Sequence, residues 1–235
     1  MLGSRKIAFV MFGQSQRFGD YLDIINGCGG FLSKVVVNME DPAPAGVRRF
    51  DDRIRDANQF LERSGLAHPI EVETMAVFLP KAGERYLVGF GGVQVAPLQE
   101  MLREKFDVSF ENLIHPSAVI SPFGRRGQGI IVGAGVVVAS GVTLGDFCSV
   151  NRACSIGHDA TIGAYTHIGP GANVASGVIV GDGAVVGIGA TIIENIRIGE
   201  GAFVAAGAVV TRDVRRGSMV AGTPAKHKKM WKRPG

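Results

Sequence analysis

Residues 161–192 read TIGAYTHIGPGANVASGVIVGDGAVVGIGATI, and every sixth residue from Ile162 to Ile192 is aliphatic. The series extends from Ile114 to Val210, and only Arg126 interrupts it. A period of six matches neither an α-helix nor the alternation of a plain strand, and fixed short repeats of this kind are typical of parallel β-helices. A Gly/Ala/Val-rich sandwich or a low-complexity stretch would not hold this phase. The period therefore predicts a β-helix.

Two further positions repeat with the aliphatic one. The residue after it is usually Gly or Ala, and the residue four places on is again compact. We expect each hexad to form one short strand, to point its aliphatic side chain inward and to turn a corner at its glycine, because glycine reaches backbone angles closed to other residues. Cys148 and Cys154 occupy the second compact position, so we expect them in the core and not as catalytic thiols.

This pattern resembles the hexapeptide-repeat acyltransferases. The resemblance implies a left-handed triangular β-helix with three hexads per coil, a coil every eighteen residues, and a homotrimer. Four segments are further similar to the sugar acetyltransferases of bacterial surface glycan (lipopolysaccharide) synthesis, the PglD-like and NeuD-like enzymes. They are IHPSA (114–118), SIGHD (155–159), THIGPG (166–171) and GTPAK (222–226).

The first 112 residues lack the hexad. Their apolar runs predict strands at 7–12, 31–37 and 86–88, and their spacing predicts helices at 18–25, 51–66 and 97–106. Alternating strands and helices imply a mostly parallel sheet. We therefore predict an α/β N-terminal domain (1–112), a left-handed parallel β-helix (113–215) and a basic C-terminal tail (216–235).

In a parallel α/β sheet, ligands bind beyond the carboxyl ends of the strands, near the first glycine turn. The candidates are Gly13, Gln14 and Ser15, with the turn at 89–92. The spacing of Gly13 and Gly19 is not the dinucleotide fingerprint, so no dinucleotide cofactor is expected. The resemblance implies that this domain binds the nucleotide part of the substrate. The family usually carries Gly-x-x-Gly-His here, whereas this chain has GQSQR (13–17) and lacks the histidine.

His158 occupies neither the aliphatic nor the compact position of its hexad, so its side chain should project outward. Imidazole titrates near neutrality and can remove a proton from an acceptor that attacks a thioester. Asp159 could hold one ring nitrogen and raise the basicity of the ring. Adjacent strand residues normally face opposite ways, so the corner geometry decides that contact. The resemblance to the His-Asp pair of the family assigns catalysis to both residues.

The resemblance also implies an acetyl-CoA site along the outer face of the β-helix. His167 is similar to a second family histidine near the thioester, and the positions around Gly169, Gly187, Ala205 and Ala206 follow by resemblance. Exposed backbone groups of the strands and corners could form hydrogen bonds with the amide-rich pantetheine arm of acetyl-CoA. Asn151 occupies a position where the repeat favours Gly or Ala. It is either a tolerated corner residue or a residue that contacts the acceptor sugar.

Basic residues gather at the C-terminus. Residues 113–235 carry 12 Lys and Arg against 6 Asp and Glu, and eight of these twelve lie beyond residue 211. The group is either a solvated tail or an anion site for the phosphates of coenzyme A. Arg215 and Arg216 directly follow the last hexad, so they are better candidates than Lys228 and Lys229.

Composition excludes several other classes. The chain has 235 residues, 46% of them hydrophobic and 20% charged, which suits a globular protein. No apolar run reaches the roughly 18 residues that a membrane helix needs, and the basic start is not a signal peptide, so we expect a cytoplasmic protein without membrane insertion. Three unevenly spaced cysteines form no disulfide framework or zinc cluster. No metal and no nucleic-acid partner are expected.

Three functions are compatible with these residues. The first is N-acetylation of a nucleotide-linked amino sugar with His158 as base, and the second is O-acetylation of a sugar or sialic acid hydroxyl. The third is a β-helix without transferase chemistry, as a scaffold or a zinc carbonic anhydrase. A zinc enzyme needs three clustered histidines, whereas His68, His115 and His227 lie in other segments.

Overall fold

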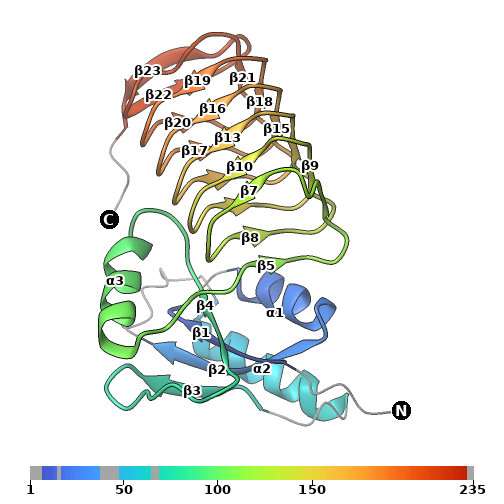
Figure 1. Ribbon diagram of the computed structural model, residues 1–235, viewed down its shortest axis with the longest axis vertical. Helices are drawn as coiled ribbons and strands as arrows, with labels where there is room; N and C mark the ends of the chain where they lie inside the picture. The colour runs from blue at the N-terminus through green and yellow to red at the C-terminus, as the bar shows by residue number, and fades with distance from the viewer. Residues whose placement is uncertain (1–6, 15–16, 38–47, 65–68, 232–235) are drawn as a thin grey trace. The chain divides into compact units, whose positions relative to one another are not determined.

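The computed structural model describes residues 7–14, 17–37, 48–64 and 69–231, and its contacts divide the chain into two units (Figure 1). The first unit contains residues up to 90 together with 100–111. The second contains residues 91–99 and the chain from 112 onward.

The first unit is an α/β fold around a four-stranded sheet in the order β3-β2-β1-β4, with all neighbours parallel. Its strands are β1 (Ile7–Phe12), β2 (Gly30–Val37), β3 (Glu71–Thr74) and β4 (Arg85–Val88). The helices are α1 (Phe18–Gly27), α2 (Phe50–Arg63) and α3 (Val95–Phe106), and the first part of α3 is counted with the second unit. The helices and strands predicted in this region are present.

Strand β3 was not predicted, because its sequence shows no apolar alternation and Val72 is exposed. Strand β3 pairs with β2 at the edge of the sheet, and a side chain of β3 also contacts a buried side chain of β2. The Nζ of Lys34, whose side chain is only 4% exposed, lies 2.7 Å from the Glu73 carboxylate. A buried charge must be paired, so this ion pair fixes β3 where hydrophobic burial does not.

The second unit is a left-handed parallel β-helix of short strands arranged in three sheets (Figure 1). The register advances by eighteen residues per coil, as in the pairing of Ser149 with His167. One sheet contains β7 (Arg125–Arg126), β10 (Thr143–Leu144), β13 (Thr161–Ile162), β16 (Ile179–Val180) and β19 (Arg197–Ile198).

A second sheet, which carries His167, contains β5 (Leu113–Ile114), β8 (Ile131–Val132), β11 (Ser149–Val150), β14 (His167–Ile168), β17 (Val185–Val186), β20 (Phe203–Val204), β22 (Ser218–Ala221) and β23 (Lys226–Met230). The third contains β6 (Val119–Ile120), β9 (Val137–Val138), β12 (Ser155–Ile156), β15 (Asn173–Val174), β18 (Thr191–Ile192) and β21 (Val209–Val210).

The core of the β-helix consists of the two side-chain columns that the sequence predicted. From Val132 onward the aliphatic residues are buried, and the compact position four places on is buried with them. Cys148 and Cys154 lie in this core, as predicted. Arg126 takes the aliphatic position of the first coil and is exposed, so the one break in the repeat falls outside the core.

The glycine after each aliphatic residue has a different role from the one predicted. The left-handed backbone angles occur two residues later, as at Gly135 (φ 66°), and not at Gly133. At Gly133 a Cβ would lie 2.6 Å from the backbone nitrogen of Arg152 in the next coil. Glycine at residue 133 therefore allows the stacked coils to approach closely, and the expectation that it turns the corner was wrong.

The C-terminal segment is folded at least as far as Trp231. Strand β23 pairs antiparallel with β22, and the Trp231 ring packs on Phe203 with 4.4 Å between ring centroids. The Trp231 amide also donates to the Gly217 carbonyl at 2.6 Å. Lys232 and Arg233 lie outside the described residues.

Candidate functional site

His158 and Asp159 form an exposed pair at a corner of the β-helix. The Nδ1 of His158 lies 2.8 Å from the Oδ2 of Asp159, and the two side chains are 66% and 73% exposed. Both groups are therefore accessible to a ligand that approaches this corner. Because a carboxylate can only accept hydrogen bonds, the contact places the proton of the neutral imidazole on Nδ1 and leaves a lone pair on Nε2.

The contact between these two neighbours depends on the corner geometry. Asp159 has φ 59°, in the left-handed region, so its side chain does not alternate with that of His158 as it would on a strand. Asp tolerates this region better than most residues. The main chain on both sides is fixed, because the Asp159 amide donates to the Ser140 carbonyl and the Gly177 amide donates to the His158 carbonyl.

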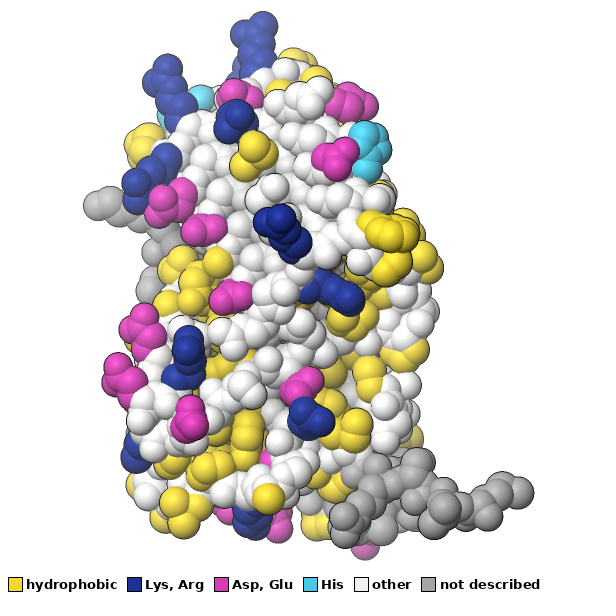
Figure 2. Space-filling view, in the orientation of Figure 1, with side chains coloured by type: hydrophobic (Ala, Val, Ile, Leu, Met, Phe, Trp, Pro, Cys, Tyr) yellow, Lys and Arg dark blue, Asp and Glu magenta, His cyan; other side chains and the backbone are white. Residues whose placement is uncertain are grey.

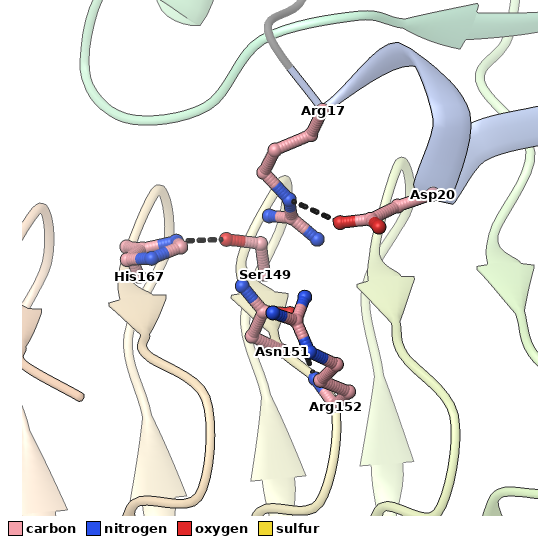
Figure 3. A network of polar contacts seen from close by, with 6 residues as sticks. All are labelled: Arg17, Asp20, Ser149, Asn151, Arg152 and His167. Carbon is pink, nitrogen blue, oxygen red and sulfur yellow. Dashed lines mark hydrogen bonds and ion pairs between the residues drawn. The ribbon is translucent and has the colours of Figure 1, made fainter. Parts of the chain in front are cut away.

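His167 lies on the outer face of the sheet that contains β14, next to Ser149 one coil away. The Nδ1 of His167 and the Oγ of Ser149 are 2.7 Å apart, and Figure 3 shows the two side chains joined. Ser149 is buried and His167 is half-buried. The sequence singled out His167 but missed Ser149; the period of eighteen between them was the signal that could have found it.

Asn151 is buried at the corner that follows β11. Its Oδ1 accepts the backbone N–H of Arg152 at 2.8 Å, so its side chain caps the turn in a position that glycine usually takes. This contact matches the corner interpretation of Asn151. A contact from Asn151 to the acceptor remains a prediction.

The predicted coenzyme positions fall on one corner of the β-helix. Gly169, Gly187 and Ala205 are eighteen residues apart and follow successive strands of one sheet. Their amides donate to the carbonyls of Val186, Val204 and Val220. Of the four predicted positions, only Ala206 has an amide without a backbone acceptor among the described residues. Ala206 is therefore the amide that can reach a ligand.

In the first unit, the ends of β1 and β4 meet as predicted. The Gly89 amide donates to the Phe12 carbonyl, and a Cβ on Gly89 would lie 3.0 Å from the Gly13 carbonyl oxygen. Gln14 follows Gly13, and its Oε1 is buried without a hydrogen-bond partner within the described residues. Such an unsatisfied acceptor suits a ligand with a polar group at this edge. Ser15 lies outside the described residues.

Arg17 is the N-cap residue that directly precedes α1, and the sequence did not single it out as a binding residue. Its Nε lies 3.2 Å from the Asp20 carboxylate, and its side chain is 27% exposed (Figure 3). Arginine at a helix N-terminus is a frequent partner of phosphate groups. It occupies the place of the histidine in the family turn.

Comparisons with known proteins support the same fold and chemistry. The family described as "Bacterial transferase hexapeptide (six repeats)" matches residues 177–212. PerB from Caulobacter crescentus, solved in complex with CoA and GDP-perosamine, is 32% identical with a TM-score of 0.72, and the match covers 94% of this chain and 97% of PerB. The chain belongs to the hexapeptide-repeat sugar acetyltransferases.

Two further structures are similar to this acetyltransferase. A histidine variant of the Caulobacter perosamine N-acetyltransferase, also with CoA and GDP-perosamine, is 29% identical over 94% of this chain and 97% of that one, with a TM-score of 0.75. The acetyltransferase domain of PglB from Neisseria gonorrhoeae is 24% identical, with a TM-score of 0.75 and coverage of 95% and 100%; it shares the fold. Among curated protein sequences, none matches this chain.

At the basic end of this acetyltransferase, Arg215 and Arg216, which the sequence analysis treated as a pair, have different surroundings. Lys and Arg side chains gather at the end of the β-helix that carries β22 and β23 (Figure 2). The Nη2 of Arg216 lies 2.9 Å from the Glu200 carboxylate. Arg215 has no ion pair with any described residue and lines a cavity of about 550 Å³, together with Arg212 and Lys226. Arg215 is therefore the better placed of the pair for an anion.

The described residues contain neither a candidate metal site nor a candidate membrane-spanning helix. No cluster of three or more His, Cys, Asp or Glu side chains there could hold a metal ion. No helix in that part of the chain is both long and apolar enough to cross a bilayer.

Proposed function

We propose that this protein is an acetyl-CoA-dependent N-acetyltransferase that acts on the amino group of a nucleotide-linked amino sugar in bacterial surface glycan synthesis. The exposed His158–Asp159 pair carries the proposal. Asp159 accepts a hydrogen bond from the Nδ1–H of His158, so His158 Nε2 can remove the proton that an amine must lose when it attacks a thioester carbonyl. The sulfur of coenzyme A is the leaving group.

The relatives support both substrate classes, since PerB was solved with CoA and with GDP-perosamine, a nucleotide-linked amino sugar. The first unit would bind the nucleotide through Gly13, Gln14 and Ser15, and Asn151 would contact the sugar. The Oε1 of Gln14, buried without a hydrogen-bond partner in the described part of the chain, fits a ligand with hydrogen-bond donors at that edge.

The β-helix would hold acetyl-CoA through His167, Gly169, Gly187, Ala205, Ala206, Arg215 and Arg216. Two observations fit that ligand. The Ala206 amide has no backbone acceptor among the described residues, which suits an amide-rich arm, and the Arg215 side chain, which lines a cavity and has no ion pair with any described residue, suits phosphate. We propose further that the enzyme is cytoplasmic and forms a homotrimer.

The test is a thiol-release assay with purified protein, acetyl-CoA and a panel of nucleotide-linked amino sugars in which the nucleotide is varied. We expect turnover only with acceptors that carry an amino group. The same sugars with a hydroxyl in place of the amine should be inert. Turnover of the hydroxyl sugars alone would establish O-acetylation and overturn the N-acetyl assignment, and no turnover with any sugar would favour a scaffold.

The role of His158 is tested in the same assay. His158→Ala should lower kcat by about 10²- to 10⁴-fold with nearly unchanged affinity for acetyl-CoA, because only the proton transfer is lost. His115→Ala is the matched control, since His115 also lies in the β-helix and has its Nδ1 bonded to a neighbouring serine, Ser117. Near-normal turnover in His158→Ala would remove this residue from the mechanism.

A further inference from the structure

Two histidines of the β-helix use the same ring nitrogen with different partners. The Nδ1 of His158 contacts the carboxylate of Asp159, and the Nδ1 of His167 contacts the hydroxyl of Ser149. In a neutral imidazole, the hydrogen bond at one nitrogen decides which nitrogen carries the proton. A carboxylate only accepts a hydrogen bond, whereas a hydroxyl can donate or accept. The two histidines can therefore hold opposite tautomers.

The surroundings of Ser149 decide between the two possibilities for His167. Ser149 is 4% exposed, so water does not supply a partner for its hydroxyl. Its neighbours along the sheet are Ile131 on one side and His167 on the other, and within the described residues its hydroxyl has no hydrogen-bond partner except His167. If Nδ1 carried the proton, the serine O–H would be buried without an acceptor, which is unfavourable. The hydroxyl therefore donates to Nδ1, and the imidazole proton lies on Nε2.

We propose that Ser149 is a positioning residue that holds His167 as an Nε2–H donor, so that His167 donates a hydrogen bond to the carbonyl oxygen of the acetyl thioester. The tautomer of His167 follows from its contact with Ser149, whereas the choice of the thioester carbonyl as the hydrogen-bond acceptor rests on the proposed function. A donor at this oxygen stabilises the negative charge that develops when the amine attacks. His158 would accept a proton through Nε2, and His167 would donate a hydrogen bond through its own Nε2.

The β-helix provides a matched control for Ser149. Ser155 occupies the same place in the neighbouring hexad, as the first residue of β12, but it is exposed and pairs with Val137 and Asn173 in the register. Replacing Ser155 by Ala removes the same hydroxyl from the same repeat position without touching a histidine. Ser149→Thr keeps a hydroxyl at residue 149 and serves as the conservative variant.

The first measurement is the tautomer, read from ring nitrogen shifts of protein labelled with ¹⁵N-histidine, without substrate and above pH 7. We expect the His167 Nε2 to be protonated and the His158 Nδ1 to be protonated. Ser149→Ala should convert His167 to a mixture of tautomers, whereas Ser149→Thr and Ser155→Ala should leave its signals in the wild-type pattern. A protonated Nδ1 on His167 in the wild type, or an unchanged tautomer in Ser149→Ala, would overturn the proposal.

The second measurement is acetyl transfer by the same variants. Ser149→Ala should lower kcat/KM by about 2- to 13-fold, the range for one hydrogen bond, with Ser149→Thr restoring most of it. Full activity in folded Ser149→Ala would refute the role of Ser149 in turnover. If the wild type transferred acetyl to no acceptor, the proposed function would fail, and the nitrogen shifts would still decide the assignment of Ser149.

Discussion

Two glycines of one corner, Gly133 and Gly135, should differ in why a larger side chain destabilises the fold there. An added Cβ at Gly133 would lie 2.6 Å from the backbone nitrogen and 3.0 Å from the Cα of Arg152. At Gly135 there is no atom within 4 Å of the added Cβ, but φ is 66°. Gly133→Ala therefore introduces a steric overlap, and Gly135→Ala introduces only backbone strain.

The size of each effect follows from these distances. Carbon contacts are optimal at about 3.5–4.0 Å, so the Cβ at residue 133 is too close by roughly 1 Å to a coil whose main chain is held by the hydrogen bond from Asn151 to Ile168. Overpacking of this kind destabilises by about 1–3 kcal/mol. A non-glycine residue in the left-handed region costs about 1–2 kcal/mol, and Ala153 adopts that conformation at the same corner one coil later (φ 57°).

The assay is scanning calorimetry of the two single variants and the wild type. Each kcal/mol should lower Tm by about 2–4 °C in a chain of this size. We expect the larger decrease for Gly133→Ala, which also has to displace the next coil. If Gly135→Ala were the more destabilised of the two, the close approach of coils would not be the reason for the small residue at this position.

Four further predictions concern the site and the assembly. Besides the loss of activity expected for His158→Ala, Asp159→Asn should lower kcat by a larger factor than it changes KM, because the Asn amide can donate to Nδ1 and so favour the wrong tautomer of His158. Steady-state kinetics, with Asp182→Asn as control, measures this. Arg215→Gln should raise KM for acetyl-CoA by about fivefold, the equivalent of roughly 1 kcal/mol, and by more than Arg216→Gln, because Arg216 is already paired with Glu200. Coenzyme A without its 3′-phosphate should bind more weakly. If both variants had the wild-type KM at low salt, the basic end would have no assigned role. Iodoacetamide should label Cys28 in the native protein, whereas Cys148 should react only after unfolding, because burial, with a smaller contribution from Asp146, raises the pKa of Cys148 to about 12. Intact mass spectrometry counts the adducts. Labelling of Cys148 in the native protein would contradict its burial. Light scattering should give about three times the chain mass of 24.8 kDa, and a monomer at micromolar concentration would refute the trimer.

The sequence alone determined the β-helix, because each hexad is a local unit whose aliphatic and compact residues recur at fixed spacing. That spacing is a property of the chain, so the buried cysteines and the outward position of His158 follow from it, whereas the coil of eighteen residues was implied by the family resemblance. The alternation of the first 112 residues likewise gave a parallel α/β fold. It did not give β3, whose place at the sheet edge depends on a buried contact between Lys34 and Glu73.

The tertiary structure decided which atoms meet. Where a glycine follows an aliphatic residue, it faces the next coil, and the left-handed turn lies two residues later; both facts depend on how coils stack and not on the repeat itself. His158 and Asp159 are neighbours in sequence, but only the left-handed angle at Asp159 brings their side chains together. Ser149 and His167 are eighteen residues apart, and the stacking of coils makes them partners. Hydrogen bonds require distances of a few tenths of an ångström around an optimum, and a residue pattern fixes order and spacing but not such distances.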